Sequence, residues 1–140
     1  MSAPLHRVLL VEDDPNDVHF MKRAWAKVGI EWVLDVAEDG DLAVQKLSVE
    51  PRPDYILLDL KLPKRTGLSV LAWIRRESSA PSTRVIVLTS SNETKDRDMA
   101  TELGIDLYLI KPVSYPMLVA LAREIAKTWV IPCKSEASPS

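Results

Sequence analysis

Five short apolar runs alternate with stretches of helical periodicity along this chain, and no other feature of the sequence constrains the fold as strongly. Consecutive Val, Ile and Leu residues in such runs are typical of strands that are buried on both faces of a sheet. Strands of this kind are parallel, and each connection between them needs a crossover of helical length. The sequence predicts strands over residues 7–11, 32–36, 55–58, 85–88 and 107–110.

The segments that follow these runs carry start and stop signals for helices. Asp14 before Pro15 is a strong helix start, with Asp14 as N-cap and Pro15 at the first helical position. Gly29 and Gly104 are suited to end the helices that precede them, because glycine readily adopts the conformation that follows a helix. We expect helices over residues 15–28, 39–49, 67–77, 93–103 and 115–129.

These units predict one α/β domain, a five-stranded parallel sheet that is doubly wound in the flavodoxin-like (βα)5 manner. A length of 140 residues suits one domain, and a hydrophobic fraction of 46% with a charged fraction of 27% supplies an ordinary core. We assign residues 1–131 to this domain. The polar, Ser/Pro-rich residues 132–140 are expected to form a disordered tail, and no output domain is expected.

Charge and cysteine content argue against several classes of protein. A formal net charge of -2 and a pI near 5.7 give no basic footprint for nucleic acid. Cys133 is the one cysteine, which rules out an internal disulfide and a Cys2His2-type zinc site and favours a reducing compartment. Met1–Leu5 lack the pattern of a signal peptide, and no apolar stretch approaches bilayer length. We therefore expect a cytoplasmic protein that binds neither nucleic acid nor membranes.

Polar and charged residues stand where four of the predicted strands end. Glu12 and Asp13 follow the first strand, Asp59 the third, Thr89 the fourth and Lys111 the fifth. Taken alone, each has an ordinary explanation, because acids after strands form turns, threonines cap strand ends and lysines lie at surfaces. The carboxyl ends of parallel strands share one edge, however, and doubly wound folds bind ligands there. The occurrence of all five together favours a functional site.

The chemistry of these residues indicates a cation and a phosphoryl group. Three neighbouring carboxylates repel one another, and a divalent cation that prefers oxygen ligands, Mg²⁺ or Mn²⁺, relieves that repulsion. Lys111 offers a positive charge, and Thr89 a hydroxyl donor, to phosphate oxygens. Asp59, placed between a metal ion and an ammonium group, is then a nucleophile suited to accept a phosphoryl group.

The ordered motifs of the chain resemble the receiver domains of two-component response regulators, from Arg7 to about Trp129. The matching motifs are Val11-Glu12-Asp13-Asp14, Asp54-Tyr55-Ile56-Leu57-Leu58-Asp59, Leu62-Pro63 with Gly67, Leu88-Thr89-Ser90, and Lys111-Pro112. The resemblance implies a response regulator that receives a phosphoryl group from a sensor histidine kinase in a Mg²⁺-dependent reaction. It further implies signalling by protein–protein contact or by phosphorelay.

The resemblance also assigns roles to single residues. The resemblance implies that Asp59 is the phosphoacceptor and that Lys111 contacts the phosphoryl group bound there. The implied metal ligands are the side chains of Glu12, Asp13 and Asp59 and the backbone carbonyl of Lys61. The first acid of the family is more commonly Asp, so the longer Glu12 reaches the metal either directly or through water.

Two further positions resemble the conformational switch of the family. Thr89 is implied to move toward the phosphoryl group, and Tyr108 to turn into the space that Thr89 leaves. An aromatic residue on an edge strand also has a plain packing role, and that alternative stays open for Tyr108. Lys61 and Ser91 occupy positions that tune the lifetime of the phosphoryl group in the family.

A narrower resemblance links the chain to the single-domain regulators of bacterial phytochrome kinases. It rests on Leu62–Arg65, Asn92–Arg97 and Trp129. It implies a bacteriophytochrome as the kinase and a homodimer through the last helices and strands. The apolar chain end around Trp129, Val130 and Ile131 has two interpretations, because it can cap the core or stay exposed as a partner surface.

Two other functions stay open. A metal-dependent phosphatase with an Asp nucleophile typically carries a second acid two residues further on, where this chain has Lys61. A phosphorylation-independent adaptor would keep the fold without needing the acids, the hydroxyl and the lysine. The four glycines are scattered, so the sequence contains neither a P-loop nor a dinucleotide-binding loop. We expect no enzymatic activity beyond self-catalysed phosphorylation and dephosphorylation.

Overall fold

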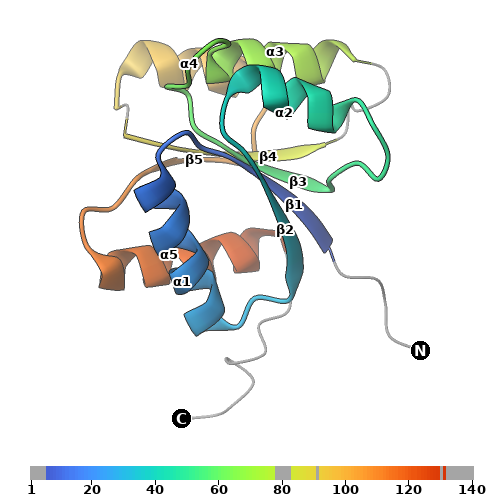
Figure 1. The fold of residues 1–140 in the computed structure, drawn as a ribbon. Helices are drawn as coiled ribbons and strands as arrows, with labels where there is room; N and C mark the ends of the chain where they lie inside the picture. Colours follow the sequence, from blue (N-terminus) through green and yellow to red (C-terminus); the bar gives the residue numbers. More distant parts are fainter. Residues whose placement is uncertain (1–5, 78–82, 91, 130, 132–140) are drawn as a thin grey trace.

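The computed structural model describes residues 6–77, 83–90, 92–129 and 131 of the chain. Its centre is a sheet of five parallel strands in the order β2-β1-β3-β4-β5 (Figure 1). The strands are β1 (His6–Val11), β2 (Trp32–Ala37), β3 (Tyr55–Leu58), β4 (Arg84–Thr89) and β5 (Leu107–Ile110). The predicted five-stranded parallel sheet is confirmed, with a strand at each of the predicted places.

Helices cover both faces of this sheet. They are α1 (Pro15–Val28), α2 (Gly40–Leu47), α3 (Gly67–Arg76), α4 (Thr94–Leu103) and α5 (Tyr115–Trp129). Helices α1 and α5 lie on one face, and α2, α3 and α4 lie on the other (Figure 1). The fold is therefore the doubly wound, flavodoxin-like one that the sequence predicted. Among the described residues, no helix is both long enough and apolar enough to cross a bilayer.

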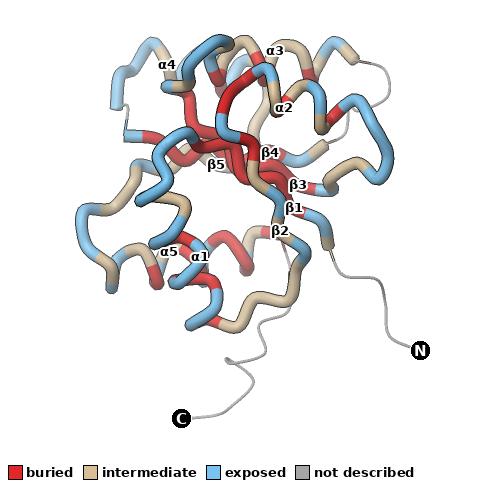
Figure 2. Tube along the Cα trace, viewed as in Figure 1, coloured by how far each residue is buried: buried red, intermediate tan, exposed pale blue. Residues whose placement is uncertain are grey.

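Two apolar layers separate the sheet from its helices, because the central strands send alternate side chains to opposite faces. Val8 and Leu57 lie in the layer against α1 and α5, whereas Leu9 and Ile56 lie in the layer against α2, α3 and α4. All four side chains are buried, and Figure 2 shows buried residues gathered along these strands. Burial on both faces explains why the strands are continuously apolar rather than alternating.

The predicted ends of α1 are present. Asp14 Oδ1 accepts a hydrogen bond from the backbone N of Asn16 at 2.9 Å, and Pro15 is the first helical residue. Gly29 follows the helix with a φ of 77°, a left-handed conformation that glycine adopts without steric cost. The N-cap fixes the point at which the chain turns from β1 into α1, directly after the acids that end β1.

Helix α2 is shorter than the predicted span of residues 39–49. Asp39 is its N-cap and accepts a hydrogen bond from the backbone N of Leu42 at 2.8 Å, and the helix ends at Leu47. A proline disfavours the helical conformation of the residue before it, so Pro51 prevents the helix from continuing through Glu50. The boundaries of the other helices agree with the predicted ones within one residue.

The end of α5 packs into the core. Trp129 is 2% exposed, its ring stacks on Tyr55 with centroids 4.5 Å apart, and its Nε1 donates a hydrogen bond to Asp106 Oδ2 at 2.8 Å. Ile131 is also buried. These two residues cap the core and are not an exposed partner surface, while Val130 and the predicted tail at 132–140 lie outside the described residues.

Candidate functional site

Asp59 follows β3 at the edge where the predicted site residues meet. Its side chain is only 5% exposed. Its Oδ1 accepts hydrogen bonds from Thr89 Oγ1 at 2.9 Å and from the backbone N of Lys61 at 3.1 Å, and its Oδ2 accepts one from Lys111 Nζ at 2.8 Å. The ends of β3, β4 and β5 therefore converge on one carboxylate, as the sequence predicted.

Glu12 and Asp13 bring two more acids to Asp59 from the end of β1. One carboxylate oxygen from each of the three residues lies within 4.8 Å of the others. Glu12 is buried and Asp13 is exposed, so the cluster reaches from the interior to solvent. An oxygen-only cluster that is open to water on one side fits Mg²⁺ or Mn²⁺, since Mg²⁺ uses one or two carboxylates and keeps several waters.

The cluster also lies where the topology of the sheet favours a ligand. Strand β1 pairs with β2 on one side and β3 on the other, so the chain winds in opposite directions from it. Ligands of doubly wound sheets bind in the crevice beyond the carboxyl ends of strands at such a switch point. Glu12 and Asp59 are the residues that directly follow these two paired strands.

Lys111 supplies the positive charge of the site. Its Nζ lies 2.5 Å from Glu12 Oε1, 2.8 Å from Asp59 Oδ2 and 3.0 Å from Asp17 Oδ2. The contact with Glu12 is an ion pair, and within the described part of the chain no group makes a hydrogen bond of good geometry to this Oε1. The lysine side chain is 15% exposed, so its charge acts in a largely dry environment.

The contact with Asp17 was not predicted from the sequence. Asp17 lies in the first turn of α1, where an acid is ordinarily explained by its favourable interaction with the helix dipole. The available signal was its position three residues after the N-cap Asp14, which keeps it near the edge of the sheet where the helix begins. That signal does not predict that Asp17 contacts Lys111, the residue after β5.

The ionisation of Glu12 and Lys111 reflects this arrangement. Burial raises the pKa of Glu12 to about 7, and the negative charge of Asp59 adds to this rise, whereas Lys111 opposes it. Burial alone would lower the pKa of Lys111, but its contacts with the carboxylates of Asp59, Glu12 and Asp17 prevail and raise that pKa above its ordinary value. Lys111 is therefore protonated, while Glu12 can hold a proton near neutral pH in the metal-free protein.

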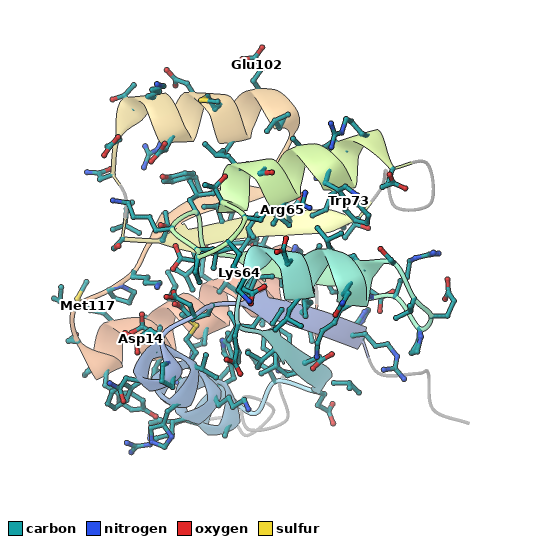
Figure 3. All side chains as sticks on the ribbon, turned by 45° about the horizontal axis from the view of Figure 1, so that its top comes forward. Asp14, Lys64, Arg65, Trp73, Glu102 and Met117 are labelled. Carbon is teal, nitrogen blue, oxygen red and sulfur yellow. The ribbon has the colours of Figure 1, made fainter. Side chains whose placement is uncertain are left out.

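Gly67 allows α3 to begin close to Asp59. A Cβ at this position would lie 2.2 Å from the backbone O of Asp59 and 2.5 Å from the Cα of Leu60, closer than real side chains approach. The backbone N of Gly67 donates to the O of Leu60 at 3.0 Å, which closes the loop after β3. In this loop Lys64 and Arg65 lie beside the amino end of α2, with which both form ion pairs (Figure 3).

Comparison with known proteins identifies the family to which this fold belongs. The family model of the response regulator receiver domain matches residues 8–123. The chain belongs to this family. The matched span contains each residue of the acid cluster together with Thr89 and Lys111, and the predicted resemblance is confirmed over residues 8–123.

Single-domain regulators are among the similar proteins. The response regulator Rcp1 of Synechocystis sp. is 33% identical over 135 residues, covering 92% of this chain and 92% of Rcp1. The Mn²⁺-bound crystal structure of Rcp1 superposes with a TM-score of 0.82 and 32% identity, covering 93% of this chain and 100% of that one. The phosphorylated cyanobacterial phytochrome response regulator RcpA gives a TM-score of 0.84 with 28% identity, covering 92% and 99%.

Longer regulators match as well. The transcriptional activator protein IrlR of Burkholderia pseudomallei is 35% identical over 121 residues, which cover 86% of this chain and 50% of IrlR. The chain thus spans about half the length of this relative, while it spans nearly all of Rcp1. The receiver fold is common to both kinds of protein.

Tyr108, the predicted switch residue of this receiver, lies on β5 beside Val87 of β4. Its ring is half-buried and packs against the apolar layer under α2, α3 and α4, and the Cζ of Arg97 lies 5.0 Å from the ring centroid. The packing role that the sequence left open is therefore present, and the switch role stays a prediction. Of the two lifetime positions, Lys61 is exposed next to Asp59, and Ser91 lies outside the described residues.

Proposed function

We propose that this receiver domain accepts a phosphoryl group on Asp59 from the phosphohistidine of a sensor histidine kinase, in a reaction that requires Mg²⁺ or Mn²⁺. One observation carries the proposal: a buried carboxylate contacts Lys111 through one oxygen and lies within 4.8 Å of two further acids. A purely structural carboxylate needs the lysine but gains nothing from two more negative neighbours. The Mn²⁺-bound form of Rcp1 supports the choice of cation.

The proposed transfer is a displacement at phosphorus. An Asp59 oxygen forms the new P–O bond while the P–N bond to the donor histidine breaks, and the leaving imidazole nitrogen keeps the electron pair and takes up a proton. Lys111 and Thr89 stabilise the charge on the oxygens of the transferred group. A bound divalent cation, held by Glu12, Asp13, Asp59 and the backbone carbonyl of Lys61, supplies further positive charge to those oxygens.

Loss of the phosphoryl group is the same chemistry with water as nucleophile. Water attacks phosphorus, the P–O bond to Asp59 breaks with its electron pair on the carboxylate, and inorganic phosphate leaves. Receiver domains are signalling modules rather than enzymes, and we propose that both steps here are catalysed only by the domain on itself. Lys61 lies next to Asp59, so it is placed to influence the rate of this second step.

We propose that Thr89 and Tyr108 carry the signal within the domain. Thr89 Oγ1 donates to the acceptor carboxylate in the present state, and a phosphoryl group offers the hydroxyl a more highly charged partner. Movement of Thr89 would open space toward β5, where Tyr108 lies. Arg97 of α4 contacts the Tyr108 ring, which supports a link between the switch and that helix.

We base the proposed kinase of this domain on its relatives. Similarity to the cyanobacterial phytochrome response regulator RcpA supports a bacteriophytochrome as kinase. We propose output by protein contact or phosphorelay, within a cytoplasmic protein whose receiver domain ends near residue 131. The exposed apolar side chains Met99 and Ile110, on α4 and β5, support a homodimer through the last helices and strands.

A phosphorylation assay tests the proposed function. Acetyl phosphate with Mg²⁺ should add one PO₃ unit to the wild-type protein, measured by intact-protein mass spectrometry, as an adduct that is stable in acid and labile in base. Asp59→Asn should abolish the adduct, and Asp98→Asn, which removes an exposed acid on α4, should not. A wild-type protein that stays unmodified would support the adaptor alternative, and steady turnover of phosphate esters would support the phosphatase.

A further inference from the structure

The Asp17 side chain contacts the ammonium of Lys111 from outside the acid cluster. Its Oδ2 lies 3.0 Å from Lys111 Nζ, and its side chain is 38% exposed, against 1% for Glu12 and 5% for Asp59. Among the described residues, the acids close enough to share a metal ion do not include Asp17. Asp17 therefore lowers the net positive charge around Lys111 without being placed to bind the cation.

We infer that Asp17 is a positioning residue that competes with the phosphoryl group for the ammonium of Lys111. This inference rests on the proposed phosphorylation of Asp59. An ammonium has three N–H donors and no acceptor, and three carboxylates already surround this one. An incoming phosphoryl oxygen must therefore replace or share a contact that Lys111 already makes.

Asp17 is the carboxylate that Lys111 can release at the lowest cost. The Asp17 side chain is 38% exposed, so water can hydrate its carboxylate once the contact breaks, and this hydration lowers the cost of release. The Glu12 carboxylate is 1% exposed and cannot be hydrated in this way, so its separation from Lys111 costs more. The hydrogen bond from Lys111 to Asp59 would be replaced by one from Lys111 to the phosphoryl group on Asp59.

The consequence is a domain that binds the phosphoryl group less tightly than its site would otherwise allow. Asp17 stabilises the unphosphorylated state by holding Lys111 and repels the anionic group that replaces it. It also joins the first turn of α1 to the residue that follows β5, two segments on the same side of the sheet (Figure 1). Phosphorylation should therefore loosen this contact between α1 and the loop before α5.

The test compares an anion with a cation at the same site. Beryllofluoride, an anionic mimic of a phosphoryl group, is titrated by calorimetry into protein saturated with Mg²⁺. Asp17→Asn should bind it about two- to fivefold more tightly than wild type, the range expected when a half-exposed ion pair stops competing. Affinity for Mn²⁺ alone, measured from free Mn²⁺ by electron paramagnetic resonance, should be equal or lower, and Asp17→Glu should restore the wild-type affinity for beryllofluoride.

The controls separate the possible failures. Asp98→Asn removes the same charge from an exposed site on α4 and should leave beryllofluoride affinity unchanged. Equal or weaker beryllofluoride binding by Asp17→Asn, or a parallel gain for Mn²⁺, would overturn the competing role. Failure of the wild-type protein itself to bind beryllofluoride with Mg²⁺ would instead overturn the proposed phosphorylation of Asp59.

Discussion

Lys111 Nζ lies 2.8 Å from Asp59 Oδ2, so the buried acid receives its counter-charge from a residue 52 positions later in the chain. The same ammonium lies 2.5 Å from Glu12 Oε1. One ammonium group thus neutralises part of the negative charge of two buried acids, and the stability of the metal-free site depends on Lys111.

Lys111→Met should destabilise the metal-free protein by about 3 kcal/mol, because it leaves the buried carboxylate of Asp59 without a counter-charge. Urea denaturation in the presence of EDTA measures the loss. Lys22→Met serves as the control, since Lys22 is an exposed lysine on α1, and it should leave the free energy of unfolding nearly unchanged. Equal stability of the two variants would mean that the ion pairs contribute nothing.

Glu12 gives the metal-free protein a specific dependence on pH. Its pKa rises from an ordinary 4.5 to about 7 on folding, so the folded state holds this proton more tightly than the unfolded state does. The resulting stability is fully present below the unfolded pKa and is lost as pH rises through the folded one.

Glu12→Gln mimics the protonated acid and should remove this dependence. The variant should equal wild type at about pH 4 and exceed it by on the order of 3 kcal/mol at about pH 8, both without metal. Denaturation curves at several pH values in EDTA provide the measurement. A constant difference between the two proteins across this range would contradict the raised pKa of Glu12.

The hydrogen bond from Thr89 to Asp59 predicts a difference between two substitutions. Thr89 is fully buried, and its hydroxyl donates to Asp59 Oδ1 at 2.9 Å. Thr89→Val keeps the shape but removes the donor, and it should cost about 2 kcal/mol of stability, as expected for a buried hydrogen bond to a charged group. It should also slow phosphorylation by acetyl phosphate.

Thr89→Ser is the matched variant because it retains the hydroxyl and loses one methyl group. It should keep a phosphorylation rate near that of wild type while losing about 1 kcal/mol through the small cavity that it creates. If Val and Ser reduced the phosphorylation rate equally, packing at position 89 would matter and the hydroxyl would not.

Most of the fold was predictable because its signals are local. The apolar runs specified all five strands, and the Asp14-Pro15 and Gly29 signals placed both ends of α1. The end of α2 was missed by two residues, since Val49 is a further apolar residue before Pro51, but it is exposed and the helix ends at Leu47. Sequence alone also left the direction of Trp129 undecided, because packing on Tyr55 depends on a strand 74 positions earlier.

For the site, the amino-acid sequence was enough to show which chemical groups reach the shared edge, because each apolar run shows where its strand ends. Glu12, Asp13, Asp59, Thr89 and Lys111 needed no coordinates to be grouped. The three-dimensional structure was needed to show that Glu12 is buried and that Lys111 contacts three acids. It was also needed to show that Asp17 is one of those acids. These facts depend on how α1 packs against α5 and beside the residue that follows β5, and side-chain packing between distant elements leaves no periodic trace in the chain.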